Sequence, residues 1–409
     1  MNTGQPATAI DAAQQPWLRD KSLRAIFTIF AAAGAEARAV GGAVRDMFLG
    51  RLVGEVDLAV NRPPEIAEAL LLQAGIKVVR TGFAHGTVTA VVKGRGYEIT
   101  SLRRDVETDG RHAEVAYTDE WAEDAARRDF TMNALYADSE GRVYDYHCGL
   151  EDLRAGRVRF IGRAEERIAE DYLRILRFFR FHAWYGRAKA DEAALAACAE
   201  AAGGMVQLSR ERITQEWRKL LLAPDPASAL ALMKKHGVLA EVLPLDLDLE
   251  RLGRLLSLAP DAGFALRFAA LLREDRQLEP VLHAALRLPN REMRDILDLL
   301  DPARAAAPDR KAFNKALYRY GAPYGKARLL LQAAADGLPP LLPELLAAAA
   351  AWNAPRFPLT GEDFLKLGLA SSPRLGVMMR EIEDWWIAGG FKAERDACLA
   401  EARRLIGEP

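Results

Sequence analysis

The sequence predicts an α+β protein whose small sheet-containing head is followed by an all-helical remainder. Short apolar alternations bounded by glycine run through residues 22–155, which is typical of strands joined by tight turns. After residue 160, alanine and leucine dominate, helical periodicity takes over and strand signals end. A chain of 409 residues is too long for one hydrophobic core, so we expect about two to four packed units. Such segregation of strands from helices is the pattern of α+β proteins.

The head contains five predicted strands and one predicted helix. The strands are RAVGG (38–42), EVDLAV (55–60), KVVRTG (77–82), GTVTAVVKG (86–94) and GYEITSLRR (96–104). The helix spans residues 61–75. Pro63 and Pro64 stand in its first turn, where missing amides cost little, and Gly75 ends it.

The remainder opens with a helical pattern that continues without a break over residues 165–186. Two further patterns follow over residues 209–223 and 226–237, and Ser209 is the expected N-cap of the first of these two.

The first of these helices carries a charged arc within EDYLRILRFFRF (170–181). At about 100° per residue, Asp171, Arg174 and Arg177 fall on the same side. A solvated face with salt bridges is the simplest interpretation, because opposite charges three residues apart stabilise helices. Phe178 and Phe181 share that arc, however, and a charged arc flanked by aromatic rings is suited to holding a nucleobase against the protein.

Composition narrows the cellular setting. The net charge is −1, from 56 basic and 57 acidic side chains, so any RNA-binding surface must be a local basic patch. No apolar run approaches the roughly 20 residues that span a bilayer, and residues 1–24 form a leader without the features of a secretory signal. Three cysteines without a CxxC pair favour a reducing compartment, so we expect a cytoplasmic protein.

The first chemical signal is a pair of carboxylates two residues apart. Glu55 and Asp57 would point to one face of a strand and could hold two Mg²⁺ ions, as phosphoryl transfer requires. The preceding GGAVRD (41–46) supplies Gly42 in a turn that permits close phosphate approach and Arg45 as a bidentate donor. A solvated strand end is the alternative for the carboxylates alone.

With RRDFTMNALYAD (127–138) and the Glu-Asp-x-x-Arg of residues 170–174, the chain resembles the class II CCA-adding enzymes and bacterial poly(A) polymerases. The resemblance covers about residues 35–390 and implies a polymerase-β-like nucleotidyltransferase head before a helical neck, body and tail. The family has Asp-x-Asp where this chain has Glu55-Val56-Asp57. The expected domains are the leader (1–24), head (25–155), neck (156–222), body (223–340) and tail (341–409).

The resemblance also implies roles for individual residues. Arg128 would neutralise the triphosphate, and Asp129 would accept from the ribose or orient an arginine. Asp171 and Arg174 would read the edge of the incoming base in place of a template. Further expected contributors are a third carboxylate, Glu98, on a strand beside the metal strand, and Arg177 and Arg180, which would reach the phosphates or brace the pair.

The implied activity is addition or repair of the 3′ CCA of tRNA from CTP and ATP. The expected partners are tRNA and the two nucleotides, without a membrane or an evident obligate protein partner. A tRNA backbone patch is expected from basic residues interleaved with tyrosines: Lys311, Lys315, Arg319, Lys326 and Arg328. A solvated helix face is the alternative interpretation of that patch.

Other activities of related chains stay open at this point. They are poly(A) synthesis, addition of CC or A alone, and a non-catalytic tRNA-binding relative. The polar segment 105–122 resembles the family loop that couples to the switch from C to A addition, which argues against a CC-only enzyme.

Overall fold

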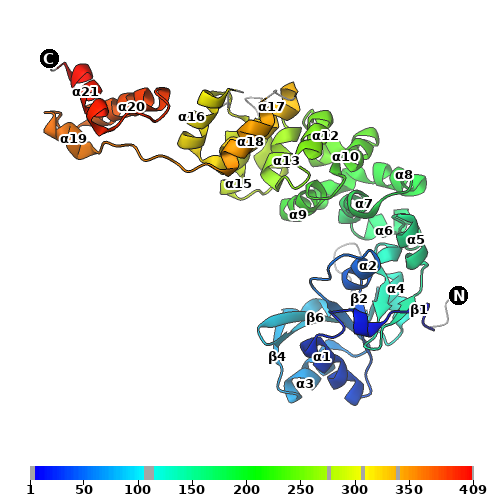
Figure 1. Ribbon diagram of the computed structural model, residues 1–409. Helices are drawn as coiled ribbons and strands as arrows, with labels where there is room; N and C mark the ends of the chain where they lie inside the picture. Colours follow the sequence, from blue (N-terminus) through cyan, green and yellow to red (C-terminus); the bar gives the residue numbers. More distant parts are fainter. Residues whose placement is uncertain (1–4, 106–114, 274–277, 305–308, 338–340, 408–409) are drawn as a thin grey trace. The chain divides into compact units, whose positions relative to one another are not determined.

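The computed structural model describes residues 5–105, 115–273, 278–304, 309–337 and 341–407, and it divides into two compact units. The first unit is Met1–Pro244 and the second is Leu245–Pro409 (Figure 1). Strands are found only in the first unit among the described residues, so the predicted α+β fold class is confirmed. The finer division into head, neck, body and tail stays a prediction.

The head is built on an eight-stranded mixed sheet. In spatial order its strands are β1 (Thr8–Ala9), β10 (Arg142–Asp145), β9 (Leu135–Ala137), β2 (Ala37–Val40), β3 (Asp57–Val60), β6 (Arg95–Ser101), β5 (Thr87–Val92) and β4 (Lys77–Gly82). Only the β3–β6 pairing is parallel in this sheet. A separate pair, β7 (Arg103–Asp105) and β8 (Val115–Tyr117), flanks residues 106–114, so the expected loop of residues 105–122 lies partly outside the described residues.

Five helices complete the head: α1 (Lys21–Ala32), α2 (Gly42–Phe48), α3 (Pro64–Gln73), α4 (Trp121–Ala126) and α5 (Gly149–Ala155). Helices α1 and α3 cover one face of the sheet (Figure 1), where α1 buries Leu23, Ile26 and Phe30. The expected leader is part of the head, because β1 pairs with β10 through Thr8 and Val143.

The rest of the first unit is helical. Its helices are α6 (Ala164–Glu170), α7 (Leu173–Tyr185), α8 (Glu192–Glu200), α9 (Arg210–Leu221), α10 (Pro226–Lys235) and α11 (Val238–Val242). The prediction of a single helix over residues 165–186 is wrong, because the helix is interrupted between α6 and α7. At the break, Asp171 is extended (φ −156°, ψ 106°), and its side chain accepts a hydrogen bond from the Leu173 amide at 3.1 Å.

The second unit contains only helices among its described residues. They are α12 (Leu249–Leu258), α13 (Phe264–Leu271), α14 (Leu278–Ala285), α15 (Asn290–Leu300), α16 (Arg310–Tyr320), α17 (Ala322–Asp336), α18 (Leu342–Ala350), α19 (Gly361–Lys366), α20 (Pro373–Ala388) and α21 (Arg395–Ile406). One core gathers α16, α17 and α18 around Phe313 and Leu329, and another gathers α19, α20 and α21 around Phe364 and Trp386. No helix among the described residues is long and apolar enough to cross a membrane.

Candidate active site

Three acidic residues lie around the neighbouring strands β3 and β6 and influence one another's charge. Asp57 is the first residue of β3, and the parallel register pairs Leu58 with Ile99, which sets Glu98 beside Asp57 as expected. Glu55 precedes β3 instead of lying on it, since the strand begins two residues later than predicted. The face is nevertheless shared, because Glu55 and Asp57 are exposed while Val56 between them is buried.

The charges of these residues influence one another. Desolvation by the surrounding protein raises the pKa of the Asp57 carboxyl, and the negative charges of Glu98 and Glu55 raise it further. Such mutual repulsion, together with hard oxygen donors, fits a divalent cation. Among the described residues, no three His, Cys, Asp or Glu side chains approach closely enough to cage a metal.

The double-glycine turn brings the RRD segment close to this strand. Gly41 has φ 66° and ψ −112°, a conformation that side-chain-bearing residues avoid, and Gly42 begins α2 immediately after it. A Cβ on Gly41 would lie 3.4 Å from the Asn133 carbonyl oxygen and 4.0 Å from Nη1 of Arg128. Arg128 therefore lies next to the turn.

Arg45 does not project from this turn toward a ligand, contrary to the expectation. It is 8% exposed, and its Nε and Nη2 donate to the two carboxylate oxygens of Asp46 at 3.0 and 3.2 Å. Its Nη1 donates to Asn133 Oδ1 at 2.7 Å, and the guanidinium lies 4.4 Å from the Tyr185 ring centroid. Arg45 therefore joins α2 to the RRD segment and to α7.

Asp129 is paired with an arginine, which is the contact that the second of its two expected roles requires. It is 7% exposed, accepts from the Phe130 amide and the Asn133 side chain, and pairs with Arg177 of α7 at 2.5 Å. Burial alone would raise the pKa of Asp129, but Arg177, the Asn133 amide and the Phe130 amide together bring it below its usual value.

The expected base-reading pair is held by neighbours in this structure. The Asp171 carboxylate accepts from the Leu173 amide through Oδ1 and from Arg212 of α9 through Oδ2 at 2.7 Å. Arg174 donates to the Arg167 carbonyl at 2.7 Å and pairs with Glu170.

The remaining part of the arc is not a nucleobase platform. Phe178 and Phe181 are 0% and 3% exposed and pack against Phe130. Arg180 pairs with Glu216 of α9 at 2.5 Å, a contact that joins α7 to α9 and fits the bracing alternative. The rings expected to flank a base are therefore core residues.

The expected RNA patch of the second unit is divided between exposed lysines and paired arginines. Lys311, Lys315 and Lys326 are exposed, although Lys315 lies 3.5 Å from Asp384. Arg328 is 8% exposed and donates to the Leu299 carbonyl, so its place in the patch is wrong. The charge of Arg319 is already paired within the protein, because its guanidinium contacts Glu383 and, at 3.1 Å, Asp384.

Several residues that hold the site together were not among the predicted site residues. Asp124 lies four residues before Arg128, a spacing that brings side chains together over one helical turn and could have indicated their pairing, although α4 ends at Ala126. Arg212 and Glu216 come from α9, and nothing local in the sequence connects them to α7.

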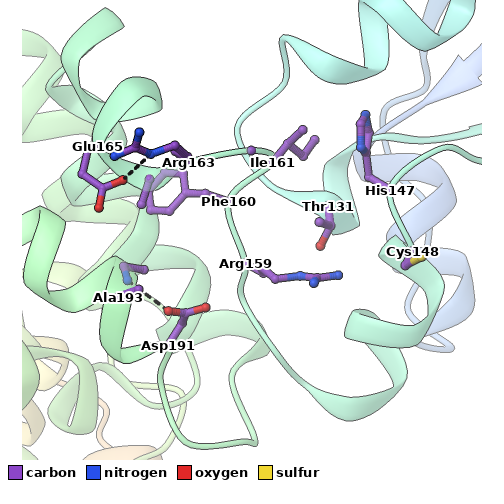
Figure 2. A pocket seen from close by; sticks show the side chains of 13 residues that line it. Thr131, His147, Cys148, Arg159, Phe160, Ile161, Arg163, Glu165, Asp191 and Ala193 are labelled. Carbon is purple, nitrogen blue, oxygen red and sulfur yellow. Dashed lines mark hydrogen bonds and ion pairs between the residues drawn. The ribbon is translucent and has the colours of Figure 1, made fainter. Parts of the chain in front are cut away.

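A pocket of about 580 Å³ lies between Thr131, residues 147–148, the segment 159–165 and the start of α8, as Figure 2 shows around Thr131, Arg159 and Asp191. It contains none of the predicted catalytic or nucleotide-contacting residues. Arg159, which lines it, pairs with Asp152 at 2.8 Å. The pocket is therefore separate from the candidate active site.

Comparison with known proteins gives two family matches and relatives along nearly the whole chain. Residues 37–159 match the "Poly A polymerase head domain", and residues 189–246 match the "Probable RNA and SrmB- binding site of polymerase A". "CCA tRNA nucleotidyltransferase 1, mitochondrial" of Danio rerio is 34% identical over 94% of this chain and 92% of its own length. A CCA-adding enzyme of Streptococcus sanguinis is 33% identical over 90% of this chain and 93% of its own length.

Solved structures are similar over comparable lengths. The CCA-adding enzyme of Bacillus stearothermophilus in complex with CTP gives a TM-score of 0.76 at 30% identity, covering 94% of this chain and 97% of that one. The Thermotoga maritima CCA-adding enzyme complexed with tRNA gives a TM-score of 0.71 at 18% identity, covering 97% and 99%, which supports the fold alone.

Proposed function

We propose that this chain, which belongs to the CCA tRNA nucleotidyltransferase family, adds or restores the 3′-terminal CCA of tRNA from CTP and ATP without a nucleic-acid template. The observation that carries the proposal is the likeness along nearly the whole chain to CCA-adding enzymes, one of them bound to CTP. The tRNA 3′ hydroxyl attacks the α-phosphate of the nucleotide, and pyrophosphate leaves. No covalent enzyme intermediate is required.

The proposed metal site consists of Glu55 just before β3, Asp57 at the start of β3 and Glu98 within β6. Nucleotidyltransferases of this family generally use a divalent metal, and we assign Mg²⁺ to Glu55 and Asp57, with Glu98 as the third carboxylate. When bound, a pair of such ions lowers the pKa of an attacking hydroxyl and stabilises a leaving pyrophosphate. The raised pKa of Asp57 supports the assignment, because crowded carboxylates lose their repulsion when a cation binds.

The triphosphate would lie against the Gly41-Gly42 turn. Arg128 is the proposed contact there, because its Nη1 lies 4.0 Å from the position of a Gly41 Cβ. Arg45 has a supporting part, since its described hydrogen bonds already use all three of its nitrogens. Arg177 is held by Asp129, which connects the head to α7.

Base selection is assigned to Asp171 and Arg174 at the junction of α6 and α7. Cytosine and adenine both present an exocyclic amino group, whereas guanine and uracil present a carbonyl oxygen at the equivalent position. An ionised carboxylate only accepts hydrogen bonds, so Asp171 would favour the two amino-bearing bases. Each carboxylate oxygen of Asp171 has one described partner and a second lone pair, so a base can bind without displacing Arg212.

The exposed lysines Lys311, Lys315 and Lys326 are proposed to contact the tRNA backbone. A cytoplasmic location stays a prediction, because the relatives include enzymes named as mitochondrial.

The test uses purified protein, Mg²⁺ and tRNA that lacks its CCA end. We expect CTP alone to extend the tRNA by CC, and CTP with ATP to complete CCA and stop there. A long ladder with ATP alone would identify a poly(A) polymerase, and arrest after CC with both nucleotides would identify a CC-adding enzyme. Binding of tRNA without incorporation of either nucleotide would overturn the catalytic proposal.

A further inference from the structure

Arg128 is held in place by two buried groups from different elements. Asp124 of α4, one turn before it, pairs with Nη2 of Arg128 at 2.9 Å. Tyr136 of β9 accepts a hydrogen bond from Nε of Arg128 at 3.0 Å. The tyrosine hydroxyl in turn donates to Oδ2 of Asp124 at 2.8 Å, so the three side chains form a closed triangle.

All three members are shielded from water. The Asp124 side chain is 1% exposed, Tyr136 is 0% exposed, and the Arg128 side chain is 19% exposed. Burial opposes the charge of Asp124, but Arg128 and the neighbouring Arg127 outweigh it and lower the pKa of Asp124 to about 2. Burial raises the pKa of Tyr136, so its hydroxyl keeps the proton that it donates. Hydrogen bonds to a charge in such surroundings are strong and directional.

The tyrosine is itself fixed by its neighbours. The Trp121 ring meets the Tyr136 ring edge to face at a centroid distance of 5.4 Å, and both belong to one core cluster. Trp121 Nε1 donates to Glu36 at 3.1 Å, which ties the start of α4 to the sheet. The triangle therefore joins α4 to β9 and leaves Arg128 little rotational freedom.

We propose that Asp124 and Tyr136 are positioning residues that hold the Arg128 guanidinium against the Gly41 turn, where it meets the triphosphate of either nucleotide. The inference rests on the phosphate role proposed above for Arg128. Its direction follows from which nitrogens are used: Nε and Nη2 face the clamp, while Nη1 faces Gly41. Such preorganisation increases the contribution of a charged donor, because no reorganisation is needed when the nucleotide arrives.

The decisive variant is Tyr136→Phe, which removes the hydroxyl and keeps the ring in its packing. The matched control is Tyr144→Phe, because Tyr144 belongs to the same core cluster and its hydroxyl also bonds a carboxylate, Asp138, at 3.1 Å. Single-nucleotide incorporation gives KM and kcat for CTP and for ATP in each variant. The Tyr136→Phe change is then repeated in an Arg128→Ala background.

We expect Tyr136→Phe to raise KM by about tenfold to a hundredfold, the effect of losing one hydrogen bond to a charged group. The increase should be equal for CTP and ATP, with unchanged base selection, an unchanged unfolding temperature relative to Tyr144→Phe, and no further effect once Arg128 is alanine. A second variant, Asp124→Asn, should change KM in the same direction.

Two results separate the inference from its premise. If Arg128→Ala incorporates both nucleotides normally, the phosphate role of Arg128 is wrong. If Arg128→Ala is impaired but Tyr136→Phe matches Tyr144→Phe, or if its effect persists in the Arg128→Ala background, the clamp is overturned.

Discussion

The variant Glu216→Ala should destabilise the first unit by about 3–5 kcal/mol, because it leaves a buried arginine without its partner. Arg180 of α7 and Glu216 of α9 approach to 2.5 Å, with side chains 13% and 5% exposed. Burial lowers the pKa of Arg180, the charge of Glu216 opposes that change, and nearby Arg177 adds to it. The attraction between the two charges therefore offsets their desolvation cost, and either charge alone would stay buried without that compensation.

The size of the effect can be expressed as a melting temperature. The first unit spans Met1–Pro244, and for domains of about this size 1 kcal/mol corresponds to about 2–4 °C. Glu216→Ala should therefore lower the melting temperature by about 6–20 °C in thermal unfolding followed by circular dichroism. Replacing both partners, Arg180→Met with Glu216→Leu, should restore most of the loss, since an apolar pair of similar volume is often neutral.

Nucleotide addition by the double variant decides what Arg180 does. A bracing role predicts near-normal incorporation of CTP and ATP at a temperature where the variant is folded. A phosphate contact predicts a stable protein with poor incorporation. A loss below about 1 kcal/mol in Glu216→Ala would instead refute the reasoning from burial.

Three further outcomes are expected. Asp57→Ala should abolish nucleotide addition while filter binding of tRNA persists. Glu55→Asp should stay active, whereas Glu55→Ala should be severely impaired. Normal addition by either alanine variant would show that the replaced residue is not part of the metal site. Arg174→Ala should relax exclusion of UTP and GTP by about tenfold to a hundredfold in single-nucleotide incorporation, so equal slowing of all four nucleotides would leave it only a bracing role. The pKa of Asp124 is lowered in the folded protein, so its ionised form should add about 2 kcal/mol to the free energy of unfolding at neutral pH, and this contribution is lost as pH falls from about 4 to about 2. Acid unfolding of Asp124→Asn should lack that pH-dependent loss. The same acid-unfolding profile in the variant and the parent would contradict the prediction.

Local patterns determined what the sequence could predict. The strand over Lys77–Gly82 lies where alternation and flanking glycines indicated it, and α3 begins at Pro64, one of the two prolines that marked its start. Ser209 caps α9 by accepting from the Arg212 amide, as its position predicted. These features depend on residues within a few positions of one another, so a single sequence contains their cause.

Features that depend on contacts between distant elements could not be predicted from the sequence. The helical pattern over residues 165–186 gave no sign of a break, because the carboxylate of Asp171 is held by Arg212, 41 residues further along the chain. Arg328 shares a basic stretch with exposed lysines, yet α17 packs so that the Arg328 guanidinium donates to a carbonyl in the last turn of α15. Charge along a helix does not tell which side another helix will cover.

The ion pairs and hydrogen bonds of the site arginines determine which of their nitrogens can still bind a nucleotide. In the described structure Arg45 uses Nε, Nη1 and Nη2 in hydrogen bonds, whereas Arg128 and Arg177 use Nε and Nη2. A guanidinium has five N–H donors, so the predicted nucleotide contacts of Arg128 and Arg177 would leave their carboxylate partners in place. Binding then adds partners to groups that are already fixed, and the cost of ordering these long side chains is met when the protein folds, before any nucleotide arrives.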